Sequence, residues 1–455
     1  MKILFIGWHP VPFMSGGANQ YLDEIMQRFQ NKGHEIYFFF TGRYDLKFRP
    51  YLKRWELNGI TMLELTNSPN LAPKQYGNPL QECSEPKIEE IYSKALLTIK
   101  PELVHIHELA GCCASIISIT VNHKIPTLLT LHNCWPVCPQ GTLFNSKQEL
   151  CTNYNLGQEC LNCASRPFLN FYIKTIRRLN HFPIPWELIK KSYPFITKLL
   201  KTAKINRPAV NEKTTNQNAE NYLYRRQYFI NALNHADRII AVSQGLKNLY
   251  IKMGVIPEKI ISLSPVSIVP QSITSPPYRP GTSLCFGYMG GLAPHKGLHI
   301  LLKAFAGLDQ TKAKLLIYGN CTSTLYSEEL KNLAKGLNVE FRGAYNKKKL
   351  GEVLQEIQIG VVPSICYEAY GLVIKEFFAA KIPVLASDIG GMPEQIANGV
   401  NGLIFKANSS ADLRTKMEQI IADPSILMEW RKNIVPPPEI EPHLKKLLSV
   451  YSTIL

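Results

Sequence analysis

The fold class is decided by the stretch VVPSICYEAYGLVIKEFFAAKIPVLASDIGGMPEQIANGVNGLIF, residues 361–405. It begins within an apolar run, Ile359 to Val362, that predicts a buried strand, and a helical pattern starts at Gly371. A second apolar run, Ile382 to Ala386, predicts another buried strand before a glycine pair. Buried strands that alternate with helices are typical of a parallel α/β sheet, which binds ligands at the carboxyl ends of its strands.

Two acids accompany this unit. Glu368 lies in the loop after the first strand, and Glu376 lies eight residues later within the helical pattern. Eight helical residues would separate them by about 12 Å and roughly 80° of turn, which fits two parts of one extended ligand better than one shared metal or proton. The helix start at Tyr370–Gly371 would offer free N–H groups and a positive dipole end to a phosphate. An ordinary structural unit with two surface carboxylates is the alternative.

The rest of the chain repeats this alternation in two halves. Its 455 residues are enough for two to three domains. Gly16 and Gly17 stand at the start of the first helix, where glycines let the backbone approach a phosphate closely. A Pro- and Ser-rich stretch predicts a linker between the halves. We expect two Rossmann-like α/β domains that face each other across a ligand cleft. They would span residues 1–265 and 281–435, with a tail, 436–455, that packs back on the first.

Other polar groups follow predicted strands. His132 stands at the end of an apolar strand, where sheet ligands bind. Lys296 lies in the glycine turn Gly290–Gly297, at the start of a helix, where it is well placed to bind a phosphate. His105 and His107 alternate with apolar residues, so one face of their strand is predicted to be polar.

A cysteine-rich segment, residues 134–163, follows His132. It has little hydrophobic periodicity, so a bound metal would supply folding free energy that its own core does not. A CxxC pair with two further thiols can close a tetrahedral zinc–sulfur site. Four reduced thiols without a metal are the alternative. The candidate ligands of this structural zinc are Cys138, Cys151, Cys160 and Cys163.

Residues 165–230 carry thirteen Lys and Arg against three Glu, a net charge of +10 out of +16 for the chain. Aromatic and aliphatic residues are interspersed, a pattern that fits either an anionic membrane surface or packed helices with one solvated face. Nucleic-acid binding has only this charge in its favour, so no nucleic-acid partner is expected. The polar residues 211–221 predict a loop.

The chain is expected to be cytoplasmic. No apolar run approaches the ~18 residues that a membrane-spanning helix needs. The first ten residues predict a strand rather than a signal peptide. If the basic segment contacts lipid, the protein would lie peripherally on the inner face of the membrane.

These motifs together resemble the group 1 glycosyltransferases, retaining nucleotide-sugar enzymes of the GT-B fold. Gly16-Gly17-Ala18 matches the family's first glycine loop, and His132 in TLHNCW matches its histidine after a strand. Gly290 to Gly297 matches its glycine turn with a KG pair. The most specific match is Glu368-x7-Glu376, followed by NGLIF. The resemblance covers nearly the whole chain, and it implies an acceptor-side first domain and a second domain that binds the nucleotide sugar.

The resemblance also implies residue roles. Glu376 would hold the ribose hydroxyls of the donor, and Glu368 would contact hydroxyls of the transferred sugar. His132 would lie beside that sugar and the reaction centre. Retention in this family is ascribed to attack on the same face as the leaving phosphate, so no catalytic divalent metal is expected.

The donor's diphosphate would be held by Lys296 and by N–H groups of Gly16–Gly17 and Tyr370–Gly371. The chain departs from the family pattern at two positions. Gly291 stands where many members carry a second cation, an arginine, for the diphosphate. Asn133 stands where an acid often follows the histidine.

The function implied is transfer of a sugar from a UDP- or GDP-type nucleotide sugar to a glycan or lipid-linked acceptor during cell-surface polysaccharide biosynthesis. A nucleotide-sugar epimerase or hydrolase of the same fold is one alternative. A non-catalytic module that binds sugar or membrane is another, which the presence of both acids and the lysine disfavours.

Overall fold

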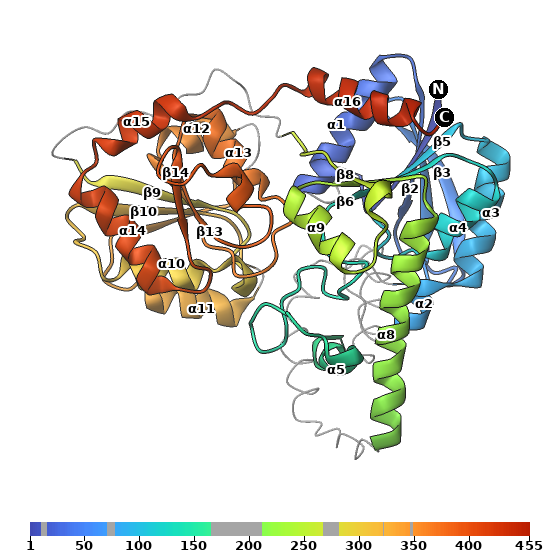
Figure 1. Ribbon diagram of the computed structural model, residues 1–455, viewed down its shortest axis with the longest axis horizontal. Helices are drawn as coiled ribbons and strands as arrows, with labels where there is room; N and C mark the ends of the chain where they lie inside the picture. Colours follow the sequence, from blue (N-terminus) through green and yellow to red (C-terminus); the bar gives the residue numbers. More distant parts are fainter. Residues whose placement is uncertain (11–15, 71–77, 165–211, 267–281, 322, 346–348) are drawn as a thin grey trace.

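The computed structural model shows two α/β lobes side by side (Figure 1). The N-terminal lobe contains an eight-stranded sheet and the C-terminal lobe a six-stranded sheet. Both sheets are mostly parallel, which confirms the predicted fold class. The structure describes residues 1–10, 16–70, 78–164, 212–266, 282–321, 323–345 and 349–455.

The N-terminal sheet has the strand order β3-β4-β2-β1-β5-β6-β7-β8. All neighbouring strands pair in parallel except β3 and β4, an antiparallel hairpin at one edge. The central strand β1 is buried on both faces, as its continuous apolar run predicts, and residues 3–6 are 0 % exposed. The strands are β1 (Lys2–Gly7), β2 (Glu35–Thr41), β3 (Tyr51–Leu57), β4 (Ile60–Thr66), β5 (Leu103–Ile106), β6 (Thr127–Leu131), β7 (Arg238–Ala241) and β8 (Ile260–Ser262).

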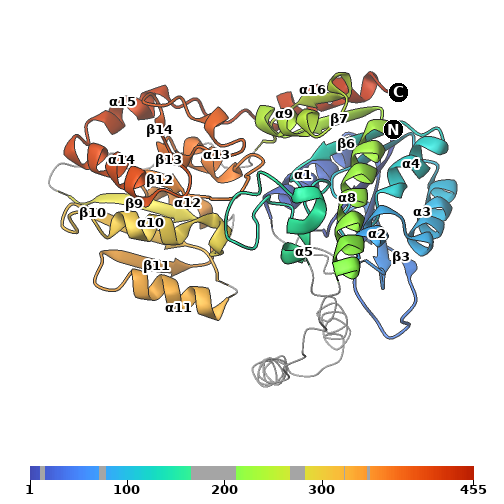
Figure 2. The same cartoon turned by 60° about the horizontal axis from the view of Figure 1, so that its bottom comes forward.

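Helices cover both faces of this sheet (Figure 2). One face packs against α3, α4, α8 and α9, and the other against α1 and the last helix of the chain, α16. The helices of this lobe are α1 (Gly17–Asn31), α2 (Pro79–Cys83), α3 (Pro86–Ile99), α4 (Ser115–Asn122), α5 (Gln158–Ala164), α8 (Glu212–His235) and α9 (Gln244–Lys252).

Helix α8 corrects one prediction. Residues 212–221 are helical rather than a loop, because α8 begins at Glu212. The helix projects beyond the lobe (Figure 1). Its later part is anchored by fully buried residues such as Phe229 and Leu233. Most of the basic segment predicted to meet a membrane, residues 165–211, lies outside the described residues. Among the described helices, none is both long and apolar enough to cross a bilayer.

The C-terminal sheet is parallel throughout, with the order β11-β10-β9-β12-β13-β14. Its strands are β9 (Leu284–Met289), β10 (Ala313–Tyr318), β11 (Val339–Gly343), β12 (Ile359–Val362), β13 (Val384–Ser387) and β14 (Gly402–Phe405). Its helices are α10 (Leu298–Phe305), α11 (Thr324–Leu333), α12 (Leu350–Gln355), α13 (Leu372–Ala379), α14 (Ser410–Ala422) and α15 (Ile426–Asn433).

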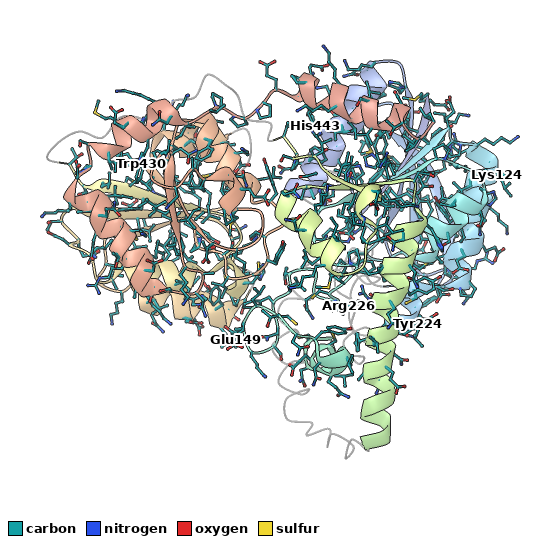
Figure 3. All side chains as sticks on the ribbon, viewed as in Figure 1. Lys124, Glu149, Tyr224, Arg226, Trp430 and His443 are labelled. Carbon is teal, nitrogen blue, oxygen red and sulfur yellow. The ribbon has the colours of Figure 1, made fainter. Side chains whose placement is uncertain are left out.

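The chain then returns to the N-terminal lobe as α16 (Ile440–Ser452). Leu444, Leu447 and Tyr451 are buried against β1 and α1. His443 of the same helix lies beside α1 (Figure 3), where its Nε2 atom is 2.7 Å from the hydroxyl of Tyr21. The last helix is therefore part of the N-terminal core, although it follows the C-terminal lobe in sequence.

Candidate active site

A cavity of about 850 Å³ opens between the two lobes. Its walls contain the carboxyl ends of β6 and β7 from one lobe and of β9, β10 and β12 from the other, which is where α/β sheets bind ligands. Eight residues that the sequence predicted to bind or position an organic ligand all line it. They are Gly16, Gly17, His132, Lys296, Glu368, Tyr370, Gly371 and Glu376.

Two helix N-termini meet across this cavity. Helix α1 starts at Gly17 and α13 at Leu372, and a Cβ atom on Gly17 would lie only 2.6 Å from Cδ1 of Leu372. Gly371 has a φ of +81°, a backbone conformation that residues with side chains rarely adopt, so glycine is needed to turn the chain into α13. Both helices place their N-termini, and so their positive dipole ends, at the cavity, which favours an anion there.

Lys296 and Glu368 form an ion pair on the C-terminal wall. The ammonium donates to Oε1 of Glu368, and Ser364 Oγ donates to the same oxygen at 2.8 Å. Burial by itself would raise the pKa of Glu368, but the ammonium and these hydrogen bonds hold that pKa below its usual value. Burial likewise disfavours the charged lysine, yet the carboxylate raises the pKa of Lys296. Both groups are therefore charged at neutral pH.

The glycine turn after β9 places this pair. Gly297 has a φ of +72°, and a Cβ atom there would lie 1.8 Å from the carbonyl oxygen of Pro363. The turn can therefore pack directly on the end of β12. The N–H of Ile365 adds a hydrogen bond to the carbonyl of His295 at 3.0 Å. Lys296 and the loop that carries Glu368 are thus held together by the backbone as well as by charge.

His132 follows β6 and lines the cavity from the N-terminal side. Its Nε2 atom is 2.9 Å from Nδ1 of His107, so its polar neighbour is another histidine rather than an acid. Burial lowers the pKa of His132 to about 4, and the imidazole is neutral at physiological pH. The amide of Asn133 instead donates to Glu108 at 2.7 Å, and its oxygen accepts from the N–H of Trp135. Asn133 therefore stabilises the loop after His132.

Glu376 lies on α13 and lines the cavity away from the ion pair. Its charge acts on Tyr345, whose pKa is raised by burial first and by Glu376 second. Glu368, by contrast, contacts Lys296 and Ser364. Glu376 thus acts on Tyr345, and Glu368 on Lys296 and Ser364.

A carboxylate that sequence reasoning missed connects the lobes. Glu394 accepts hydrogen bonds from the N–H groups of Gln244, at 2.8 Å, and Gly245 at the start of α9. The N–H of Tyr367 also donates to the carbonyl of Thr142 at 2.9 Å. The sequence shows Glu394 shortly after the glycine pair Gly390-Gly391, but it does not show that this acid pairs with the start of α9 on the other lobe.

Residues of α1 also line the cavity without having been predicted as site residues. Tyr21, Asp23 and Glu24 face it from the N-terminal lobe. Burial raises the pKa of Asp23 to about 6, and the neighbouring charge of Glu24 adds to this. The spacing of α1 indicated only its core-facing side. Polar residues one turn after the glycine pair were the signal that could have revealed its cavity-facing side.

The predicted zinc site is not assembled. In the part of the chain that the structure describes, which includes all four cysteines, no three His, Cys, Asp or Glu residues are grouped so that they could hold a metal. Cys138 is buried in the N-terminal core, whereas Cys151, Cys160 and Cys163 are only partly buried. Burial raises the pKa of the thiols of these three, and the nearby thiol of Cys138 raises each of these pKa values further. The four thiols thus lie near one another, and a structural zinc held by them stays a prediction.

Two family models match the chain. The model described as glycosyl transferases group 1 matches residues 275–435, and the model described as Glycosyltransferase Family 4 matches residues 15–183. The first range contains Lys296, Glu368 and Glu376. The second range contains Gly16, Gly17 and His132. The two matches therefore account for both walls of the cavity.

Individual proteins are similar over shorter ranges. An uncharacterized glycosyltransferase of Methanocaldococcus jannaschii is 27% identical over 202 residues, which cover 44% of this chain and 54% of that protein. A D-inositol 3-phosphate glycosyltransferase of Corynebacterium aurimucosum is 31% identical over 145 residues, 30% of this chain and 34% of that protein. The chain thus spans about half the length, or less, of these curated relatives.

Among solved structures, Anabaena HepE in complex with UDP is similar over 100% of both chains, with a TM-score of 0.64 at 16% sequence identity. The similarity extends over both lobes and the cleft between them, so the fold is shared.

Proposed function

Because the chain belongs to the group 1 glycosyltransferases and has the GT-B fold, we propose that it transfers a sugar from a nucleotide sugar to a glycan or lipid-linked acceptor. One observation carries the proposal: all eight predicted ligand residues, from both lobes, line a single cavity. Retention of configuration and a role in cell-surface polysaccharide synthesis belong to the same proposal, as does peripheral membrane contact by the basic segment.

The donor extends along the C-terminal wall. Glu376 accepts hydrogen bonds from the ribose hydroxyls, since a carboxylate can accept two of them. The diphosphate occupies the space between the N-termini of α1 and α13, within reach of Lys296. Glu368 binds hydroxyls of the transferred sugar, and His132 contacts this sugar from the opposite lobe. A uridine nucleotide is favoured because the structurally similar HepE was solved with UDP.

The reaction breaks the bond between the sugar's anomeric carbon and the diphosphate oxygen, which keeps the electron pair. The acceptor hydroxyl forms its new bond on the same face, and its proton passes to the departing diphosphate. Negative charge grows on the leaving group, so Lys296 and the two helix dipoles stabilise the transition state more than the ground state. The cleft between the lobes orients the two substrates.

Replacing Glu376 with alanine is expected to weaken nucleotide-sugar binding by about 10- to 100-fold, because charge-assisted hydrogen bonds to the ribose are lost. Thermal-shift screening with UDP-, GDP- and ADP-sugars would first identify the donor, and calorimetry would then compare the variant with the wild type. Glu352→Ala is the matched control, since Glu352 is an exposed acid of α12 in the same lobe that does not line the cavity. Unchanged binding by Glu376→Ala would refute the assignment, and donor hydrolysis without transfer would favour the hydrolase alternative.

The rate of transfer is expected to change little with pH, less than about threefold between about pH 7 and 8.5, a range that lies above the pKa of about 6 of the cavity residue Asp23. The pKa of Glu368 is lowered, so this group stays ionised in mild acid, whereas the pKa of Lys296 is raised, so it stays charged in mild base. The pKa of His132, about 4, keeps the imidazole neutral across the range. Steady-state kcat measured across this range tests the expectation. An acidic limb near pH 7 that disappears in His132→Gln would contradict it.

A further inference from the structure

A row of hydrogen-bonded imidazoles leads from the cavity into the N-terminal core. Nε2 of His132 lies 2.9 Å from Nδ1 of His107, and Nε2 of His107 lies 3.2 Å from Nδ1 of His105. His105 then contacts two hydroxyls: its Nδ1 is 2.8 Å from the phenol oxygen of Tyr451, and its Nε2 is 2.8 Å from Oγ1 of Thr130. The row therefore joins the end of β6 to α16 through the strand β5.

The row is shielded from water and from full charges. His105 and Tyr451 are 0 % exposed and His107 is 5 % exposed. The other titratable side chains packed beside the row are those of Tyr21 and His443. The ring of Tyr21 lies edge-on to His132 and tilted against His107. Burial and the neighbouring imidazoles hold the pKa values of His105 and His107 well below the usual range. Each imidazole is therefore neutral, with one donor and one acceptor nitrogen.

The buried phenol sets the direction of the row. Within the described residues, the hydroxyl of Tyr451 has one hydrogen-bond partner, Nδ1 of His105. If that hydroxyl only accepted, its proton would be buried without an acceptor, which is costly. A phenol is also a stronger donor than the aliphatic hydroxyl of Thr130. The phenol therefore donates to Nδ1 of His105, whose proton lies on Nε2 and is donated to Oγ1 of Thr130.

The proton positions of His107 and His132 follow from that of His105. Nδ1 of His105 carries no proton and its single lone pair is already engaged by the phenol, so a bare Nε2 of His107 at 3.2 Å would set two unprotonated nitrogens against each other. The proton of His107 therefore lies on Nε2, where it shares that lone pair with the phenol, and Nδ1 of His107 is left to accept. It accepts from Nε2–H of His132. The second ring nitrogen of His132, Nδ1, then carries no proton. Because His132 lines the cavity, this bare nitrogen is available to the ligand.

We propose that His107 and His105 are positioning residues that fix His132 as the Nε2–H tautomer, so that its bare Nδ1 accepts a hydrogen bond from a hydroxyl of the transferred sugar. The contact with sugar rests on the proposed function, whereas the tautomer does not. Tyr451 lies at the far end of the row on α16, the helix that returns from the C-terminal lobe. The docking of α16 on the N-terminal core is therefore part of what sets the tautomer of His132.

Two substitutions at His107 separate this role from packing. His107→Asn keeps a hydrogen-bond acceptor at the position of Nδ1. His107→Phe keeps an aromatic ring but removes this acceptor. We expect His107→Phe to lower kcat roughly tenfold, with the donor KM within about twofold, the effect of one lost hydrogen bond on an orienting group. His107→Asn should recover most of this loss. Thermal midpoints measured for both variants account for general destabilisation.

Nitrogen-15 spectra of the full chain labelled at histidine read the tautomer without turnover, with His132→Asn used to assign the signal. The proposal expects His132 protonated on Nε2 in the wild type and in His107→Asn, and a mixture of tautomers in His107→Phe. If His107→Phe does not fold, Tyr451→Phe should produce a similar mixture. A wild-type His132 with its proton on Nδ1 would overturn the proposal, as would equal kcat losses in both His107 variants. An inactive wild type with the expected tautomer would instead count against glycosyl transfer.

Discussion

The Lys296→Ala variant is expected to transfer sugar about 100- to 1,000-fold more slowly than the wild type, the loss typical when one preorganised donor to a developing anion is removed. Lys296 is the one Lys or Arg among the described residues that line the cavity. Gly291 stands where many members of the family carry a second cation. No neighbouring cation on that wall can therefore compensate when the charge on the diphosphate oxygen grows.

Lys296 and Glu368 contact each other on the cavity wall. This contact keeps the carboxylate ionised and in place. When the donor binds, the ammonium can be shared between Glu368 and the diphosphate. Removal of Lys296 therefore has two consequences: the leaving group loses its cation, and Glu368 loses the partner that lowers its pKa. We expect the loss mainly in kcat, because the leaving-group charge is largest in the transition state.

A cation introduced at Gly291 can test whether the activity lost in Lys296→Ala is restored. Gly291 is exposed, a Cβ atom there would meet nothing within 4 Å, and its φ is not in the left-handed region. A Gly291→Arg substitution should therefore be tolerated, and in the Lys296→Ala background it should recover part of the lost kcat. Steady-state kinetics with the identified donor compares the four proteins. Activity of Lys296→Ala within threefold of the wild type would refute the role of Lys296 at the leaving group.

The sequence predicts most strands well because buried parallel strands are continuous apolar runs. The run Ile359 to Val362 agrees with β12, and the run Ile382 to Ala386 overlaps β13. The eight predicted ligand residues line one cavity, since they follow strands or start helices, and strand ends converge at one edge of each sheet. Those residues needed only local patterns and their order in the chain.

The antiparallel hairpin of β3 and β4 was missed, although the signal was present. Asn58 and Gly59 connect the two strands, and both have a positive φ, 51° and 77°. An Asn-Gly pair between two strand-like runs is a strong hairpin signal. The hairpin is at an edge, and the residues of β3 are mostly exposed or half-buried, so its apolar pattern is weak.

The histidine row was beyond sequence reasoning for a different reason. Alternation predicted a polar strand face for His105 and His107, and the structure buries both. The partner that makes this burial tolerable is Tyr451, 346 residues away from His105. Periodicity indicates which side of an element is buried, but it does not identify the distant group that satisfies a buried polar atom.

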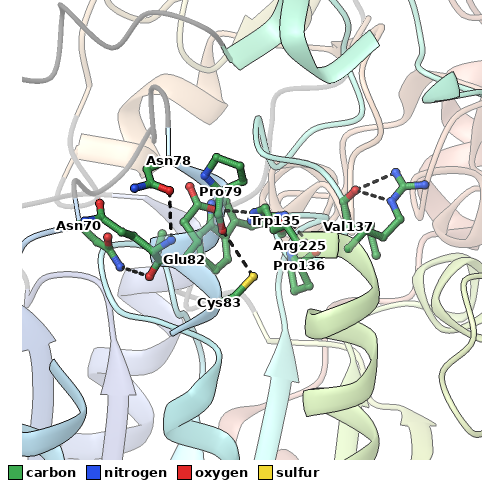
Figure 4. Close-up of polar contacts among 12 residues, drawn as sticks. Asn70, Asn78, Pro79, Glu82, Cys83, Trp135, Pro136, Val137 and Arg225 are labelled. Atoms are coloured by element: carbon green, nitrogen blue, oxygen red, sulfur yellow. Dashed lines mark hydrogen bonds and ion pairs between the residues drawn. The ribbon is translucent and has the colours of Figure 1, made fainter. Parts of the chain in front are cut away.

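A buried arginine fixes the loop that follows His132. The guanidinium of Arg225, on α8, pairs with Glu82 of α2, and the side chains are 1 % and 2 % exposed (Figure 4). It also donates to the carbonyl oxygens of Trp135 at 2.9 Å and Pro136 at 3.1 Å. Its Cζ atom lies 4.5 Å from the ring centre of Phe229. The charge is thus satisfied by one carboxylate and two carbonyls, all within the N-terminal core.

The Glu82→Ala variant is expected to lower the free energy of unfolding by about 3–5 kcal/mol, because it leaves the Arg225 guanidinium buried without a counter-charge. Urea unfolding monitored by tryptophan fluorescence measures the loss. Replacing both partners, as Glu82→Leu with Arg225→Met, should restore most of it, since no buried charge is then left unpaired. Arg226→Ala is the matched control: Arg226 donates to Val137 from the next position of α8 but forms no ion pair with any of the described residues. An equal loss in Glu82→Ala and in the double variant would show that packing, rather than the unpaired charge, accounts for the effect.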